Sequence, residues 1–196
     1  MALTTQLAAV NTMLGYIGEA PVNSISNTAE LPVSAANAVT ILNETSKEVQ
    51  SEGWHFNTTK DFVLTPVNDT ITLPSSTLQV DHEGTEDVDV VQRGLSLYDR
   101  KNRTTTFTKD IKVTIVEELV WESLPEQARR YITLKATRSL QSRLVGSTEL
   151  EGLILRDEFA AKANLERSEA ANSDRTIFDN YDAASRIGIN RNISLY

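Results

Sequence analysis

The chain has 196 residues, of which 40% are hydrophobic and 23% are charged, and it contains no cysteine. A chain of this length and composition can bury a sizeable core, and the absence of cysteine excludes disulfides, thiol catalysis and cysteine-ligated zinc. The net charge of −8 argues against wrapping of nucleic acid, which requires cations to displace counterions. No apolar run approaches the ~18 residues needed to span a bilayer, and no signal peptide is recognisable.

The N-terminal part of the sequence predicts two helices that pair through apolar stripes. The stripe of the first helix consists of Leu3, Leu7, Val10, Leu14 and Ile17. The second helix begins near Pro32, a residue suited to a first helical turn. Its apolar face consists of Val39, Leu42 and Val49. Gly53 follows this helix, where a left-handed C-terminal cap is expected.

Two aromatic residues, Trp54 and Phe56, flank His55 directly after Gly53. This arrangement allows either catalysis by His55 or anchoring of the chain where a helix gives way to a strand. In an extended segment the two aromatic side chains would share one face and His55 would point to the other. We therefore interpret Gly53, Trp54 and Phe56 as structural anchors, because aromatic side chains bury a large area.

The middle of the chain, residues 61–119, predicts a small antiparallel β-sheet inserted between helices. Short runs of strand-forming residues lie at 62–64, 70–73, 77–80, 88–91 and 95–98. Residues 97–108 have the pattern of a strand, a polar turn and a second strand. Ile111, Val113 and Ile115 alternate with Lys112 and Thr114, as in a half-buried antiparallel strand.

Helices are predicted again from Ser123, which we expect to be an N-cap with Glu126 at the capping-box position. The apolar stripe of this helix is Ile132, Ala136, Leu140 and Leu144. A second capping box, Thr148 with Glu151, opens a helix that runs to about residue 171. We expect Glu158 and Lys162 to form an i,i+4 ion pair in this last helix.

Charge is unevenly distributed along the sequence. Residues 61–92 carry no Lys or Arg and seven acidic residues: Asp61, Asp69, Asp81, Glu83, Glu86, Asp87 and Asp89. Residues 126–143 carry, against Glu126 alone, five basic residues that are candidates for subunit or DNA contacts: Arg129, Arg130, Lys135, Arg138 and Arg143. Such polarity suits a protein with unlike partners, although each segment has the alternative interpretation of a solvated surface.

The C-terminal segment, residues 172–196, has no helical stripe but is rich in apolar residues. They are Ile177, Phe178, Tyr181, Ile187, Ile189, Ile193, Leu195 and Tyr196. A disordered tail is normally poor in such residues. We therefore predict an extended arm that docks by strand addition on a partner, with folding back on its own core as the alternative.

The sequence offers little for catalysis or for cofactors. It contains no phosphate-binding glycine loop, and its two histidines are His55 and His82. Asp81, His82 and Glu83 are adjacent, so in a strand they would point to alternate faces and would not chelate a metal. We predict no enzyme activity and no cofactor. The alternative is glycan hydrolysis by carboxylates of the 81–89 segment, such as Asp87 and Asp89.

These elements together predict an α+β fold. Residues 1–60 and 120–171 would form an antiparallel helical bundle, residues 61–119 the inserted β-region, and residues 172–196 the extended arm.

The order of these elements resembles a known family. The resemblance covers residues 1–170 and is carried by four stretches: "GYIGEAPV" at 15–22, "LNETSKEVQSEGWHFNT" at 42–58, "LYDR" at 97–100 and "LPEQARRYITLKATRSLQSRLVGS" at 124–147. On these stretches the chain resembles the tail tubular protein A family of short-tailed bacteriophages, also called the head-to-tail adaptor or gatekeeper.

The resemblance implies a structural role in the virion. Such proteins form a dodecameric ring between the portal protein and the tail nozzle protein, in the short tail below the portal, and are made in the host bacterial cytoplasm. It implies that the helical part builds the ring wall, that the β-region faces the nozzle, and that the C-terminal segment docks on the portal. Double-stranded DNA passes through the lumen without sequence readout, and the ring helps to retain it. A weaker alternative is a DNA-binding module that uses the 126–143 helix.

Overall fold

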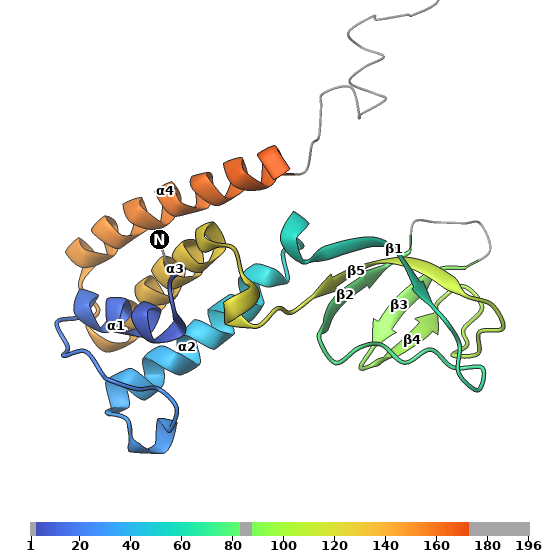
Figure 1. Ribbon diagram of the computed structural model, residues 1–196, viewed down its shortest axis with the longest axis horizontal. Coiled ribbons are helices and arrows are strands. Elements are labelled where there is room, and N and C mark those ends of the chain that lie inside the picture. Colours follow the sequence, from blue (N-terminus) through green and yellow to red (C-terminus); the bar gives the residue numbers. More distant parts are fainter. Residues whose placement is uncertain (1–2, 83–87, 173–196) are drawn as a thin grey trace, which may run out of the picture.

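The computed structural model describes residues 3–82 and 88–172, which form a helical unit and a β-unit placed side by side (Figure 1). The helical unit contains α1 (Gln6–Tyr16), α2 (Val33–Gln50), α3 (Glu126–Leu144) and α4 (Thr148–Asn172). The β-unit contains β1 (Thr58–Leu64), β2 (Thr77–Asp81), β3 (Val90–Arg93), β4 (Ser96–Asp99) and β5 (Ile111–Glu117). Short 3₁₀ turns lie at Thr28–Glu30, His55–Asn57 and Trp121–Ser123. The prediction of an α+β fold with small antiparallel sheets is confirmed; the predicted arm lies outside the described residues.

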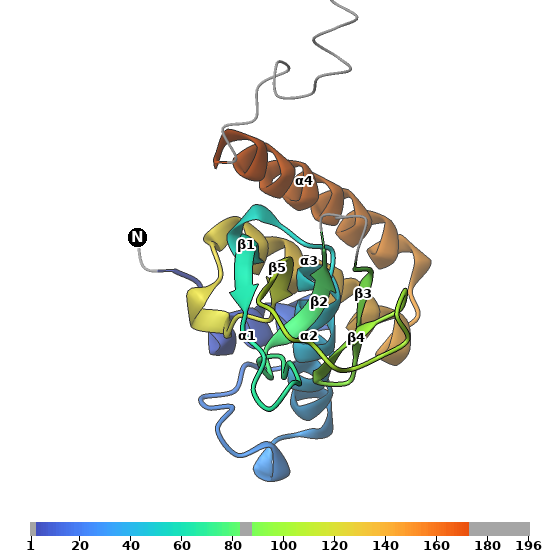
Figure 2. The same ribbon diagram turned by 90° about the vertical axis from the view of Figure 1, so that its right-hand side faces the viewer.

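Helix α3 is the centre of the helical unit and packs against α1, α2 and α4. Helices α2, α3 and α4 alternate in direction. Helix α4 packs against α3, as two perpendicular views show (Figures 1 and 2). The predicted α3 residues Ile132, Ala136 and Leu140 are fully buried, whereas Leu144 is 45% exposed and falls outside the core. Because α3 has neighbours on three sides, Tyr131 and Leu134 are buried as well.

The buried face of α1 differs in part from the predicted stripe. Its buried residues are Ala9, Val10, Met13 and Leu14. Leu3 is 52% exposed because the helix begins only after Thr5, whose hydroxyl accepts a hydrogen bond from the amide of Ala8. In α2 the predicted face holds, since Val39, Leu42 and Val49 are all buried.

The prediction that Ser123 caps α3 is wrong. Ser123 ends a 3₁₀ turn, and α3 begins at Glu126 after Pro125. Leu124 is extended, with φ −74° and ψ 143°. The physical reason is the proline ring, which disfavours helical geometry at the preceding residue. The carboxylate of Glu126 is consequently not part of a capping box and instead binds Thr4.

Two predictions for α4 are also corrected. The Ser147 hydroxyl, and not Thr148, accepts a hydrogen bond at the helix start, from the amide of Leu150. The expected pair of Glu158 with Lys162 does not form. Glu158 faces α3, where Arg138 is its partner, so it is not available on the outer surface.

The β-unit has its own core. Strands β1, β5 and β2 form an antiparallel sheet in that order, and β3 and β4 form a hairpin. The outer edge of β4 is bonded to residues 71–73, through Leu97 N to Ile71 O at 3.1 Å and Leu73 N to Leu95 O at 2.8 Å. The buried core residues are Leu64, Ile71, Leu73, Val90, Leu97, Phe107, Ile111 and Val113.

The predicted alternation of β5 is confirmed, with Ile111, Val113 and Ile115 buried and Lys112 exposed. Two other predicted strands are wrong. Residues 70–73 and the second half of 97–108 form only isolated bridges. Residues 71–73 pair with β4 through a single bridge, and Ile71 and Leu73 are buried there; in the second segment Phe107 is buried within a connection.

Candidate interaction surfaces

The candidate sites are surfaces and joints between elements. Within residues 3–82 and 88–172, no three His, Asp or Glu side chains are grouped so as to hold a metal ion. Among the helices that the structure describes, none is long and apolar enough to cross a membrane.

Arg129, a predicted DNA or subunit contact, is buried inside the helical unit with 3% of its surface exposed. Its guanidinium donates to the backbone oxygens of Leu124, Thr4 and Glu122, at 2.9, 2.8 and 2.7 Å. The indole of Trp121 also donates to Thr4 O, at 3.0 Å. This placement removes Arg129 from the set of residues that could touch a partner, and gives it the role of tying the N-terminal segment to the start of α3.

Glu126 completes this attachment. Its carboxylate accepts from the Thr4 amide at 2.8 Å and from the Thr4 hydroxyl. Burial alone would raise the pKa of Glu126, but the hydrogen bonds from Thr4 and the nearby charges of Arg129 and Arg130 outweigh burial and lower the pKa. The ionised form is therefore the one that the folded protein stabilises.

Acid is expected to weaken this attachment. Because the pKa of Glu126 is lower in the folded state, its stabilising contribution is complete above the ordinary pKa of 4.5 and is lost as the pH falls through the folded-state value. Thermal unfolding between about pH 3 and pH 7 measures this dependence. The variant Glu126→Gln should show a smaller decline in stability over the acid range than the parent chain. An identical decline in both proteins would contradict the assignment.

Three other basic residues of α3 face carboxylates of the same chain. Lys135 Nζ lies 3.2 Å from Glu48 of α2 and 3.8 Å from Glu52, just after the end of α2. Two further pairs join α3 to its neighbours: Arg138 with Glu158 at 2.5 Å, and Arg143 with Glu44 at 3.9 Å. These carboxylates offset the positive charge of the helix, so the geometry gives no support to a DNA-binding module built on α3.

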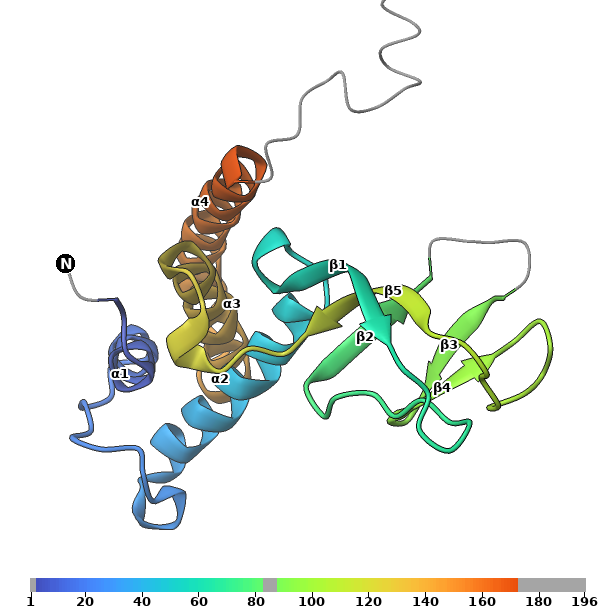
Figure 3. The same cartoon turned by 45° about the vertical axis from the view of Figure 1, so that its right-hand side comes forward.

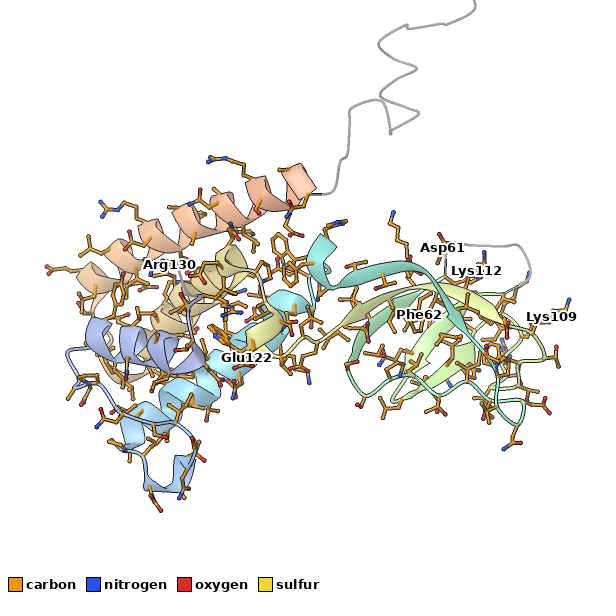
Figure 4. The ribbon with its side chains drawn as sticks, in the orientation of Figure 1. Asp61, Phe62, Lys109, Lys112, Glu122 and Arg130 are labelled. Carbon is orange, nitrogen blue, oxygen red and sulfur yellow. The ribbon has the colours of Figure 1, made fainter. Side chains whose placement is uncertain are left out.

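Arg130 is exposed and lies where α3 meets α1 and α4 (Figure 4). In this place the hydroxyl of Tyr16 donates to Asp157 of α4 at 3.2 Å. Burial and the Asp157 carboxylate raise the pKa of Tyr16, and Arg130 acts in the opposite direction. Of the five predicted basic residues, Arg130 and Arg143 are the two that are exposed.

The segment around His55 differs from the extended chain that we expected. His55–Asn57 is a 3₁₀ turn, closed by Asn57 N to Trp54 O at 3.2 Å and by Trp54 N to Asn57 Oδ1 at 2.9 Å. Trp54 and Phe56 are half-buried against the helical core, and the Trp54 indole donates to Val49 O at 2.7 Å. His55 is exposed.

Gly53 has the left-handed backbone that we predicted, with φ +74°. A Cβ atom added there would lie 3.4 Å from Val116 Cγ2 of β5. The chain therefore turns at Gly53 in close contact with the β-unit, and a side chain at this position would be strained by its backbone conformation.

Two amides that the sequence did not single out join the two units; we call Gln50 and Asn57 the polar joint. Gln50 is fully buried, and its side chain binds both the amide and the carbonyl of Leu119, at 2.7 and 3.1 Å. The Asn57 side chain donates to Gln50 O at 2.9 Å and to Glu117 O at 3.0 Å. Both crossings of the chain between the units are thus held by hydrogen bonds of two buried side chains. Gln50 lies eight residues after Leu42, on the core face of α2. A polar residue at such a position was the signal in the sequence that could have indicated a buried hydrogen-bonded side chain.

The acidic segment of the β-unit provides little for hydrolysis. Asp89 forms an ion pair with Arg100 at 2.8 Å. Asp81 accepts a hydrogen bond from the amide of its neighbour His82. Glu83, Glu86 and Asp87 lie outside the described residues. The described carboxylates therefore do not favour the glycan-hydrolysing alternative.

Helix α4 carries apolar side chains away from the core. Leu153, Leu155 and Phe159 are 53%, 37% and 65% exposed, although Ile154 and Leu165 of the same helix are fully buried. The predicted arm residues that follow α4 lie outside the described part: Ile177, Phe178, Tyr181, Ile187, Ile189, Ile193, Leu195 and Tyr196.

This architecture can be compared with known proteins. A family model described as "Tube: Tail tubular protein" matches residues 7–175, and so spans the helical unit and the β-unit. The chain belongs to the tail tubular protein family. Membership makes it a structural component of a bacteriophage tail, and hence of the virion. No curated protein matches the sequence.

Proposed function

We propose that this member of the tail tubular protein family is the head-to-tail adaptor of its phage. Copies of the chain would form a dodecameric ring between the portal protein and the tail nozzle protein. The ring would line part of the channel through which DNA is ejected and would help to retain the packaged genome. The observation that carries this proposal is the family match over residues 7–175, which includes both units and the polar joint between them.

The arrangement of the two units supports an adaptor with unlike partners at its two ends. Each unit has a separate hydrophobic core. Figure 3 shows the β-unit extending away from the helices, and the last part of α4 lies beside the His55–Asn57 turn, where Glu169 accepts from the amide of His55. In the proposed ring, the helical unit builds the wall, the β-unit faces the nozzle, and residues 172–196 reach the portal.

The surface properties are compatible with this assignment. Phe159 and Leu155, exposed on α4, provide apolar area for contacts between neighbouring copies. A chain of net charge −8 repels phosphates overall, so DNA could slide through the lumen without binding tightly.

The mass of the species formed alone and with the isolated portal ring of the same phage tests this proposal. We expect the full chain to assemble on the portal ring as a complex of defined mass. Removal of residues 173–196 should abolish attachment, because these residues supply the proposed docking arm. The truncated chain should retain the circular dichroism and the thermal transition of the full chain, since the described cores remain intact.

Two results would contradict parts of this proposal, and the first would reject the adaptor itself. One is a full chain that leaves the portal ring unchanged at every concentration tested. The other is a truncated chain that still attaches with unchanged affinity, which would reject the role of the arm alone.

A further inference from the structure

The connection between β4 and β5, residues 100–110, is a concentrated source of positive charge; we call it the cationic loop. It contains four basic residues and one acidic residue, a net charge of +3, in a chain whose total is −8, so the rest of the chain carries −11. All five are exposed: Arg100, Lys101, Arg103, Lys109 and Asp110. Figures 1 and 3 place the loop at the end of the β-unit farthest from the helices, and Lys109 marks that end in Figure 4.

The base of the cationic loop is rigid. Asp99 is buried, and its carboxylate accepts from the amides of Lys101 and Asn102 at 2.9 and 3.1 Å and from the Asn102 side chain at 2.6 Å. Burial alone would raise the pKa of Asp99, but these hydrogen bonds lower it, so the carboxylate stays ionised. Backbone hydrogen bonds between Asp99 and Thr104, at 2.9 and 3.2 Å, close the turn.

The second half of the loop is fixed to the core. Phe107 is 5% exposed, and its amide donates to Asp69 O at 2.9 Å. On the first half, Arg100 donates from its backbone amide to Asp89 O and from its side chain to the Asp89 carboxylate. A charged loop held in this way loses little conformational entropy on binding, which distinguishes it from a flexible run of solvated charges.

We propose that the cationic loop docks on an acidic protein surface of the tail component that adjoins the β-unit; this inference rests on the proposed adaptor function. One copy of the loop offers four basic residues, and the charge of Arg100 is already paired with Asp89, which reduces the attraction to phosphates. The charge of −11 on the rest of the chain also opposes approach to a polyanion. A local patch of opposite charge instead steers and orients a protein partner, and rejects wrong ones.

Charge reversal at the far part of the loop tests the inference. The double variant Arg103→Glu/Lys109→Glu should weaken binding of the portal-bound full chain to the purified nozzle protein by at least about tenfold at moderate salt. The matched control, Lys60→Glu/Lys112→Glu, makes the same change of net charge on exposed residues of β1 and β5 and should bind within about twofold of the parent chain. The neutral variant Arg103→Gln/Lys109→Gln should fall between the two.

The possible outcomes separate failure of this inference from failure of the adaptor function. Equal binding by both reversal variants, with circular dichroism showing that they are folded, would overturn the inference while leaving the adaptor intact. Failure of the parent chain to bind the nozzle protein at all would count against the adaptor itself. Binding of the parent chain to a duplex DNA oligonucleotide that is lost only in the loop variant would identify the loop as a nucleic-acid contact, and would also overturn the inference.

Discussion

Replacement of Arg129 by alanine is expected to lower the free energy of unfolding by about 3–5 kcal/mol. The buried carbonyl oxygen of Leu124 and the carbonyl oxygen of Glu122 would lose this donor, whereas Thr4 O would keep the Trp121 indole. A buried acceptor without a partner costs about 1–3 kcal/mol. The Glu126 carboxylate would also lose a neighbouring charge that favours its ionised form. Chemical denaturation followed by circular dichroism measures the change.

Two comparisons make this expectation specific. Arg129→Lys should restore little of the stability, because a single ammonium group cannot reproduce the planar arrangement of donors. Arg130→Ala removes the next basic residue, which is exposed, and should change the stability by no more than about 1 kcal/mol. If Arg129→Ala and Arg130→Ala had similar small effects, the buried role of Arg129 would be wrong.

The order and type of the long elements could be predicted from sequence because they depend on local periodicity. The apolar face of α2 and the alternation of β5 are set by residues within one element. The left-handed backbone at Gly53 was also predictable, since glycine is the residue that adopts it at least cost. Element starts were less predictable. At α3 a favourable capping pattern at Ser123 competed with the restriction imposed by Pro125, and the proline decided the boundary.

The parts that failed depend on contacts between residues distant in sequence. Arg129 and Arg130 are adjacent and alike in sequence, yet one is buried against Thr4 and the other is exposed. The basic segment around α3 was predicted as a contact surface because the carboxylates that pair with it lie on α2 and α4, far along the chain. Linear charge patterns describe composition and do not reveal which charges neutralise each other in the fold.

Replacement of Gln50 by methionine is expected to lower the free energy of unfolding by about 2–4 kcal/mol. Methionine is similar to glutamine in length, so the packing volume changes little and the loss of hydrogen bonds dominates. The partly buried amide and carbonyl of Leu119 would both lose the fully buried Gln50 side chain as a partner. Because Leu119 lies on the return crossing from the β-unit, the variant should also loosen the attachment of one unit to the other.

Gln79→Met provides the matched control, because Gln79 also bonds across the two units, to Ser51 O at 2.8 Å, but is exposed. Water can replace that bond, so the control should cost less than about 1 kcal/mol. Amide hydrogen exchange separates the two consequences of Gln50→Met. If the polar joint fixes the orientation of the units, protection should fall first at residues 116–120 while the β-unit core stays protected. A uniform loss of protection over both cores would mean that Gln50 stabilises the fold as a whole and does not act specifically on the joint.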